Sequence, residues 1–289
     1  RRPGLAPQHL TVVRALAAVS GADVEGDELR STELRFVPRR RPQADAYAFD
    51  VREAAPGGSA GSVALLLQAL LVPLAWAEAP STLTLCGGTH VAWSPSFHYL
   101  RDVFLPAVRP MGLEATCELE AYGFYPAGGG VLRARIEPVA NGASSDALRR
   151  LRPQAYTERG CLERIRGEAV TTNLPAHIAR RMAERCAERL RALDRPVEVE
   201  PVCEEGGGPG AGLFLTAEYA RVRAGFSALG RPGKPAEAVA DEACEALRRH
   251  HESGAAVDPH LADQLLLPMA LARGGSRFTT SRVPGHLRT

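Results

Sequence analysis

Polar and glycine residues that can hold phosphate groups occur at several points of the sequence. Gln8 and His9 lie close to Arg1 and Arg2 in "RRPGLAPQHL", so Arg2, Gln8 and His9 can together contact a substrate phosphate. The turns "CGGTH" and "YPAGGG" contain consecutive glycines, whose backbone N–H groups can converge on an anion. The same features occur in solvated helix ends and ordinary turns, and the residues alone favour that simpler interpretation.

Asp263 and Gln264 stand directly before an apolar run in "HLADQLLLPMALA". Two interpretations are open. Asp263 either caps the start of a helix, where the helix dipole favours a carboxylate, or it faces a nucleotide and its metal ion together with Gln264. Spacing alone favours the cap. His286 follows a Pro-Gly turn in "SRVPGHLRT", and in isolation a histidine there is a solvated side chain.

The composition is that of a globular chain. It has 289 residues, of which 45% are hydrophobic and 24% charged, and its net charge is +2, so a polyanion must be bound by a local patch. The 6 cysteines show no CxxC or Cys/His metal spacing. No signal-peptide pattern opens the chain, and we expect reduced thiols and a cytoplasmic location. The most apolar stretch, "SVALLLQALLVPLAWA", is shorter than the ~20 residues of a membrane span, so no membrane association is expected.

Periodicity places the polar residues on alternating helices and strands. Apolar residues at helical spacing predict a helix from Pro7 to before Gly21, and a buried helix around residues 65–76 that carries Gln68. Strands are predicted in "TELRFVP", "AYAFDV" and "STLTLCGGTH", a helix in "SFHYLRDVFLPAVRPMG", and two more strands in "EATCELEAYGFYPAGGGVLRARIEPV". This order predicts an α/β fold, an α+β sandwich built on βαβαββ units.

A change of composition indicates a second domain. Residues 170–233 contain an Arg- and Glu-rich helix from Pro175 to Leu193 and the glycine-rich stretch "EEGGGPGAG". A long amphipathic helix follows in "PAEAVADEACEALRRHHESG". We expect residues 1–169 and 234–289 to form a large domain of repeated βαβαββ-like units, and residues 170–233 to form a smaller α/β domain inserted into it.

Several stretches taken together resemble the RNA 3′-terminal phosphate cyclase family. They are "RPGLAPQHLTVVRAL", "GSAGSVALLLQALL", "GGTHVAWSPSFHYLRDVFLP", "GFYPAGGG" and "HLADQLLLPMALARGGSRFTTSRVPGHLRT", and they follow one another in the family's order from the first residues to the last. The resemblance implies a ligase that transfers nucleotidyl groups. It would use ATP, with Mg²⁺ or Mn²⁺, to convert the 3′-terminal phosphate of a partner RNA into a 2′,3′-cyclic phosphate.

The resemblance also implies roles for individual residues. His286 corresponds to the nucleophile that becomes adenylylated. Gln68 corresponds to an ATP-site position, and so does the segment made of His260, Leu261, Ala262, Asp263 and Gln264, in which Asp263 is the expected metal ligand. Arg2, Gln8 and His9 remain the expected contacts to the substrate phosphate.

Two other functions stay open. One is a catalytically silent cyclase-like protein that binds RNA or assists ribosome assembly, which the presence of His286 disfavours. The other is an enolpyruvyl transferase, whose family shares the repeated architecture, and which "HLADQ" and the histidine motif disfavour. Members of the cyclase family normally begin with a strand and a glycine-rich segment and continue past the histidine motif. We therefore expect the natural protein to have an additional N-terminal strand and helix and a further C-terminal strand.

Overall fold

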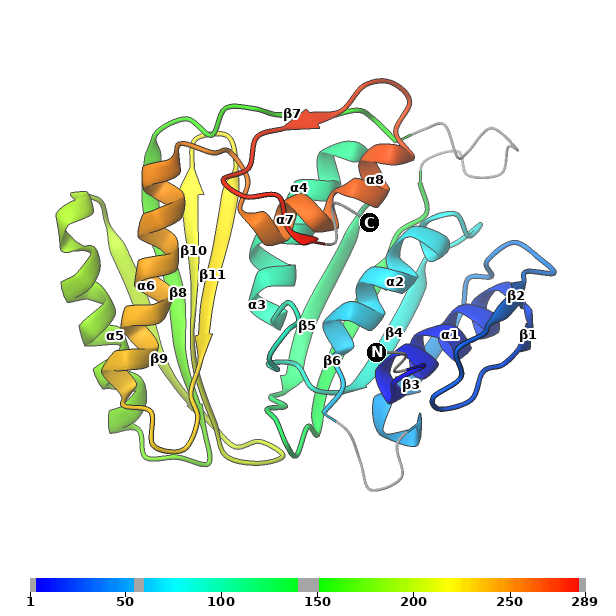
Figure 1. Cartoon of the computed structure of the whole chain (residues 1–289), viewed down its shortest axis with the longest axis horizontal. Coiled ribbons are helices and arrows are strands. Elements are labelled where there is room, and N and C mark those ends of the chain that lie inside the picture. The colour runs from blue at the N-terminus through cyan, green and yellow to red at the C-terminus, as the bar shows by residue number, and fades with distance from the viewer. Residues whose placement is uncertain (1–3, 55–59, 140–150, 286–289) are drawn as a thin grey trace. The chain divides into compact units, whose positions relative to one another are not determined.

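The computed structural model describes residues 4–54, 60–139 and 151–285. The predicted nucleophile His286 and the predicted phosphate contact Arg2 lie outside these residues. Helices and strands alternate along the described chain and form several sheets (Figure 1), which confirms the predicted α/β class. Within the described ranges, no helix combines the length and the apolar character needed to cross a bilayer.

The described residues divide into two compact units. Unit 1 is drawn from Arg1–Phe97, Gly112–Arg150 and Gly206–Gly208, and unit 2 from His98–Met111, Leu151–Glu205 and Pro209–Thr289. Each unit has its own four-stranded sheet.

The sheet of unit 1 has the strand order β3-β4-β6-β5. Strands β3 and β4 are parallel, with Ala46 opposite Thr82, and β6 is antiparallel to both β4 and β5. A helix or helical segment separates β3 from β4 and β4 from β5 in the chain, so the chain order is the predicted βαβαββ unit. The strands are β3 (Ala46–Asp50), β4 (Ser81–Gly87), β5 (Ala115–Ala121) and β6 (Gly130–Ile136), and β1 (Asp23–Glu25) pairs separately with β2 (Arg35–Val37).

Two helices of unit 1 have boundaries close to those that the sequence predicts. Helix α1 (Pro7–Ser20) starts with proline, whose fixed φ suits the first helical position, and stops at Gly21, whose φ of 55° is left-handed. Helix α2 (Val63–Ala75) is capped by Ser62, whose Oγ accepts a hydrogen bond from the N–H of Leu65 at 3.3 Å. Gln68 is the only polar residue of α2, which therefore packs between the sheet and α1 (Figure 1). A 3₁₀ turn, η1 (Val51–Ala54), follows β3.

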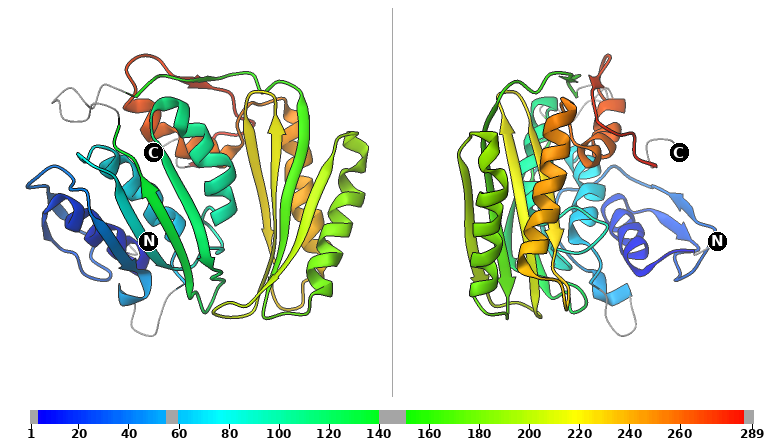
Figure 2. Two further views of the ribbon diagram at one scale, coloured as in Figure 1. Left: turned by 180° about the vertical axis from the view of Figure 1, so that it is seen from behind. Right: turned by 60° about the vertical axis from the view of Figure 1, so that its left-hand side comes forward.

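The sheet of unit 2 has the order β11-β10-β8-β9 and is covered on one face by α5 and α6 (Figure 2). β8 and β9 are parallel, and β10 is antiparallel to β8 and β11. Buried side chains from both helices and from strands β8, β10 and β11 form one core. The elements are β8 (Leu162–Thr172), α5 (His177–Leu190), η5 (Arg191–Leu193), β9 (Val197–Glu204), β10 (Gly210–Tyr219), β11 (Arg223–Leu229) and α6 (Ala236–Ser253).

Residues 97–111 are helical as predicted, but in short pieces around a π-helical turn. The pieces are α3 (Phe97–Tyr99), the π-helical η2 (Leu100–Phe104), α4 (Leu105–Val108) and η3 (Arg109–Met111). Unit 2 also contains α7 (Pro259–Gln264), α8 (Leu266–Ala270) and a parallel pair, β7 (Ala155–Tyr156) with β12 (Arg277–Phe278).

The predicted inserted domain, residues 170–233, belongs to unit 2 except for Gly206–Gly208, which belong to unit 1. β8 begins at Leu162 and α6 ends at Ser253, and both elements contribute side chains to the same core. The sheet-and-helix layer of unit 2 therefore extends on both sides of the predicted segment. That residues 170–233 form a domain inserted into a larger one stays a prediction.

The stability of unit 2 is expected to depend on the protonation of His250. Its side chain is 3% exposed between Tyr219 and Phe226, and neither ring nitrogen has a hydrogen-bond partner among the described residues. Burial lowers the pKa of His250 from 6.5 to about 4, the positive charge of Arg159 adds to this effect, and Asp258 opposes it. The unfolded chain takes up the proton near pH 6.5, whereas the folded chain does not until about pH 4.

The free energy of unfolding is therefore expected to be highest above pH 6.5 and to fall as the pH drops from 6.5 towards 4, by about 3 kcal/mol from this residue. Urea unfolding at several pH values measures this slope, with His250→Leu as the comparison because leucine keeps an apolar side chain at the site. Equal slopes for the two proteins between pH 6.5 and 4 would contradict the assignment to His250.

Candidate functional site

Gln8 forms a hydrogen bond with the N-cap residue of helix α2. Its side-chain Oε1 accepts a hydrogen bond from the N–H of Ser62 at 2.9 Å, and Ser62 in turn caps the helix that carries Gln68. The oxygen of the Gln8 amide is thus used within the fold, so its NH₂ group is the end that can donate to a phosphate. The neighbouring predicted contact, His9, is exposed, and Gln68 is half-buried.

The "CGGTH" turn joins three backbone segments of unit 1. The N–H of Gly88 donates to the carbonyl of Gly61 at 2.8 Å, and those of Thr89 and His90 donate to the carbonyl of Gly123 at 2.9 and 3.0 Å. These N–H groups are used internally, which agrees with an ordinary turn rather than a phosphate cradle. Glycine is required at position 123, because a Cβ there would lie 2.4 Å from the carbonyl oxygen of Gly87.

A buried histidine lies beneath this junction and has no counterpart in the sequence prediction. His90 is fully buried and stacks on Tyr122 and Phe124, with ring centroids 5.3 and 5.2 Å away. Its Nδ1 is 2.8 Å from the Oγ1 of Thr89, which also accepts a hydrogen bond from the N–H of Gly123 at 2.8 Å. The arrangement fixes the loop after β4 against the loop after β5.

In unit 2, Asp258 holds the start of helix α7. Its carboxylate is 1% exposed and accepts hydrogen bonds from the N–H groups of His260 and Leu261 at 2.9 and 3.0 Å. The hydroxyl of Tyr99 donates to both carboxylate oxygens at 2.8 and 3.0 Å, and the N–H of Gly225 donates at 3.3 Å. Burial, and then the negative charge of Asp258, raise the pKa of Tyr99 well above its usual value, so Tyr99 stays a donor.

The helix cap is therefore Asp258 and not Asp263, which the spacing in the sequence favoured. Asp263 belongs to the last turn of α7, and the capping interpretation of this residue is wrong. The physical reason is the pair Asp258-Pro259, an N-cap carboxylate followed by a proline at the first helical position. That signal was present in the sequence.

The segment from His260 to Gln264 has one buried and one accessible side. Leu261 and Ala262 are buried, His260 is exposed, and Asp263 and Gln264 are half-buried. Residues three and four positions apart lie on the same side of a helix, so His260, Asp263 and Gln264 share the accessible side of α7. This set combines an imidazole, a carboxylate and an amide, which are groups that can contact a base, a metal ion and a phosphate.

The described residues offer a single carboxylate, and not a cluster of ligands, to a metal ion. Within the described part of the chain, no three His, Cys, Asp or Glu side chains are grouped as a protein-only metal site would need. Mg²⁺ is commonly held by one or two carboxylates, with water and substrate phosphates as the other ligands. Asp263 fits that limited role as a single carboxylate.

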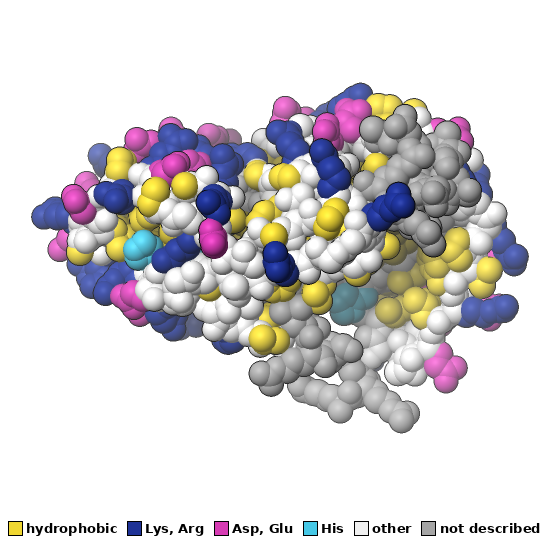
Figure 3. All heavy atoms as spheres, turned by 90° about the horizontal axis from the view of Figure 1, so that it is seen from above, with side chains coloured by type: hydrophobic (Ala, Val, Ile, Leu, Met, Phe, Trp, Pro, Cys, Tyr) yellow, Lys and Arg dark blue, Asp and Glu magenta, His cyan; other side chains and the backbone are white. Residues whose placement is uncertain are grey.

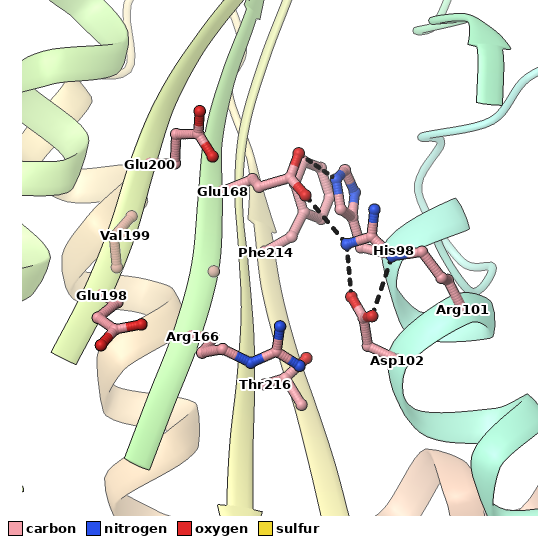
Figure 4. A pocket seen from close by; sticks show the side chains of 11 residues that line it. His98, Arg101, Asp102, Arg166, Glu168, Glu198, Val199, Glu200, Phe214 and Thr216 are labelled. Atoms are coloured by element: carbon pink, nitrogen blue, oxygen red, sulfur yellow. Dashed lines mark hydrogen bonds and ion pairs between the residues drawn. The ribbon is translucent and has the colours of Figure 1, made fainter. Parts of the chain in front are cut away.

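A pocket of about 440 Å³ in unit 2 contains a hydrogen-bonded cluster that the sequence did not predict (Figure 4). Glu168 contacts His98 Nε2 at 2.9 Å and Arg101 at 3.0 Å, and Arg101 also pairs with Asp102 at 2.7 Å. The hydrogen bond to His98 is the largest cause that lowers the pKa of Glu168, to about 2. The charge interaction with His98 and the hydrogen bond and charge of Arg101 lower it further, whereas burial opposes them. The ring of Phe214 stacks on His98 with a centroid distance of 4.6 Å.

This pocket is poorly suited to phosphate. Its second arginine, Arg166, is paired with the buried carboxylate of Glu218 at 2.9 Å, and Glu198 and Glu200 project from β9 at its edge (Figure 4). Both arginines are thus neutralised by carboxylates of the fold, and further negative charge lies close by. We interpret the cluster as the contact that joins the segment of residues 98–104 to the sheet of unit 2.

The predicted site residues are distributed over the two units. Gln8, His9 and Gln68 belong to unit 1, and His260 to Gln264 belong to unit 2. Within unit 1, the structure brings Gln8 to the cap of the helix that carries Gln68; within unit 2, it places three of the predicted residues on one side of α7. The roles assigned to these residues, and to Arg2 and His286 outside the described ranges, stay predictions.

Comparison with known proteins defines the class of this molecule. The family described as RNA 3′-terminal phosphate cyclase matches residues 1–289. RNA 3′-terminal phosphate cyclases of Gloeothece citriformis and Methylococcus capsulatus are 47% and 49% identical over this whole chain, which spans 80% and 78% of their lengths. The protein of that name from Pyrobaculum neutrophilum is 40% identical over 99% of the chain, which spans 79% of its length.

The chain belongs to the RNA 3′-terminal phosphate cyclase family. The resemblance drawn from the sequence motifs is thereby confirmed.

Proposed function

We propose that the protein closes the 3′-terminal phosphate of RNA into a 2′,3′-cyclic phosphate and consumes one ATP for each ring. The observation that carries this proposal is the family match over residues 1–289, supported by relatives of that name at 40 to 49% identity. The reaction needs a nucleophile, a nucleotide site and phosphate contacts, and the sequence supplies a candidate for each.

In the first step, the neutral imidazole of His286 attacks the α-phosphorus of ATP. A P–N bond forms, and the bond to pyrophosphate breaks. The adenylyl group then passes from His286 to an oxygen of the RNA 3′-phosphate, which converts this phosphate into an activated anhydride. The vicinal 2′-hydroxyl attacks the phosphorus of the RNA phosphate, loses its proton and expels AMP. RNA 3′-phosphate and ATP thus give cyclic phosphate, AMP and pyrophosphate.

The fold supports this proposal through positioning. Transfers of this kind depend chiefly on the orientation of the reacting groups and the stabilisation of charge. The buried Asp258 fixes the start of α7, and the side of α7 with His260, Asp263 and Gln264 is the proposed nucleotide contact. A bound Mg²⁺ or Mn²⁺ would supply charge neutralisation on the phosphates, with Asp263 as its proposed protein ligand. We further propose a cytoplasmic location, which the six free thiols support.

The test uses a single-stranded RNA whose 3′-terminal phosphate carries the radiolabel. With ATP, the label is expected to become resistant to alkaline phosphatase, because a cyclic phosphate is a diester. It should stay sensitive when ATP is replaced by an analogue that cannot release pyrophosphate. If the label stays sensitive with ATP while the RNA still binds, the catalytically silent RNA-binding alternative replaces the cyclase.

Gln68→Ala and Asp263→Ala are expected to weaken the use of ATP about 10- to 100-fold in kcat/KM, the range found when a supporting ligand of a metal or phosphate site is lost. The measurement is the rate of ring closure at several ATP and Mg²⁺ concentrations. Asp27→Ala is the matched control, since among the described residues Asp27 pairs with Arg14 on the surface. An unchanged ATP dependence in both site variants would assign Gln68 and Asp263 to structural roles.

A further inference from the structure

Two aromatic side chains of unit 1 are exposed on neighbouring loops. Trp93 is 101% exposed and Tyr125 76%, and they are the only aromatic residues among the exposed large hydrophobic residues of the described chain. Trp93 lies in the loop that follows β4, and Tyr125 lies in the loop between β5 and β6. Large flat apolar side chains in water are unfavourable for the isolated protein, so such a pair indicates a contact with a ligand.

The loops are connected to each other by hydrogen bonds. The N–H groups of Thr89 and His90 donate to Gly123, and His90 forms a bridge with Phe124. Trp93 is three residues from His90, so their Cα atoms are at most ~11 Å apart, and Tyr125 directly follows Phe124. The N–H of Gly128 donates to the carbonyl of Phe124 at 2.7 Å and closes a tight turn in which Tyr125 is the first residue. The buried rings of His90 and Phe124 and the half-buried ring of Tyr122 support both loops.

The backbone at Trp93 supplies an independent observation. Its φ of 64° is in the left-handed region, which is unfavourable for a residue with a Cβ and particularly for a bulky one. Because the indole is fully exposed, the described fold offers no burial of the ring that offsets this conformation. Strain of this kind is typical of residues that present a side chain to a ligand.

The pair lies at the end of the sheet that also carries the Gln8 contact. Gly87 at the end of β4 pairs with Gly130 at the start of β6, and Ser62, which hydrogen-bonds to Gln8, forms a bridge with Gly88. The exposed aromatic residues and the helix cap therefore occur at the same end of one sheet. Ligands of open α/β sheets bind outside the ends of their strands.

From these observations we infer that Trp93 and Tyr125 form a stacking site for nucleobases near the 3′ end of the RNA substrate, a role that rests on the proposed function. Single-stranded RNA is recognised through unstacked bases that lie on aromatic rings, and stacking tolerates any base because each has a π face. On the face shown in Figure 3, basic side chains (dark blue) are interspersed with acidic ones (magenta).

The experiment measures binding of a fluorescent single-stranded RNA with a 3′-phosphate in the absence of ATP. Trp93→Ala is expected to weaken binding about 5- to 150-fold, the range of one base–aromatic stack, with Trp93→Phe close to wild type and Tyr125→Ala reduced. Quenching of the indole fluorescence by RNA should disappear in Trp93→Phe. Leu34→Ala removes another exposed apolar side chain of unit 1 and is expected to bind normally.

Two further measurements separate this site from ATP binding and from the proposed function. Attachment of AMP to the protein without RNA should be unchanged in Trp93→Ala; if AMP attachment falls while RNA binding is unchanged, the site holds the adenine of ATP and the inference is wrong. An RNA with abasic 3′-terminal residues should bind wild type and Trp93→Ala equally, and a difference between them would contradict stacking. Because binding is measured without ATP, the result does not depend on whether the protein closes the RNA ring. Normal RNA binding by both alanine variants would overturn the stacking site and would leave the proposed function untouched.

Discussion

Replacing His286 by alanine or asparagine is expected to abolish the covalent attachment of AMP to the protein, with a loss of about 10⁴-fold or more in ring closure. Neither side chain can attack the α-phosphorus of ATP, and removal of an enzyme nucleophile has effects of this size. The measurement is retention of label from α-labelled ATP on the denatured protein. Binding of ATP itself should persist, because the proposed nucleotide contacts on α2 and α7 are unchanged.

His177→Ala is the matched control for this prediction. His177 is an exposed histidine at the start of α5, so the variant also loses one imidazole and should retain full labelling. Thermal unfolding of both variants checks that the fold is preserved. Wild-type labelling of either His286 variant would remove His286 from the mechanism.

Asp258→Ala is expected to lower the free energy of unfolding by about 3–5 kcal/mol, because it removes a helix cap and leaves further buried donors without their acceptor. AMP attachment should also fall steeply, even at temperatures where the variant is folded. The cause is that α7 loses the carboxylate which fixes the N–H groups of His260 and Leu261. Urea unfolding and the labelling assay measure the two effects separately.

Tyr99→Phe provides the graded comparison. It removes a hydroxyl that donates to Asp258 and keeps the ring, so the expected loss is about 1–2 kcal/mol with most of the labelling retained. The double variant should be less destabilised than the sum of the single variants, since both changes remove the same hydrogen bonds. Additive effects, or full labelling by Asp258→Ala, would contradict the positioning role of Asp258.

Local signals in the sequence were sufficient for most elements of unit 1. Pro7 and Gly21 mark both ends of α1, Ser62 caps α2, and the polar residue Gln68 interrupts an otherwise apolar helix. Such signals depend on neighbours in the chain, and the predicted boundaries are therefore close to the observed ones. The bounds predicted for the second domain rest on a change in composition, which does not mark where a strand or a helix ends, and they stay a prediction.

The contacts that organise the candidate site could not be predicted in the same way. Tyr99 and Asp258 are 159 positions apart, and His98 and Glu168 are 70 positions apart. The first pair fixes the start of α7 and the second joins residues 98–104 to the sheet of unit 2. Neither pair leaves a periodic pattern, because tertiary packing alone brings the partners together. The proline after Asp258 indicates the capping role of that residue, whereas the position of Asp263 before an apolar run favoured a cap at the wrong residue.

The central claim is that this member of the cyclase family forms an adenylate on His286. The most direct measurement is peptide mapping by mass spectrometry after incubation with ATP and Mg²⁺ at neutral pH. The account predicts one adenylylated peptide, with AMP on His286 and released by acid, as expected for a P–N bond. An adenylate on another residue, one that survives acid, or robust RNA cyclisation with no protein adenylate would contradict it.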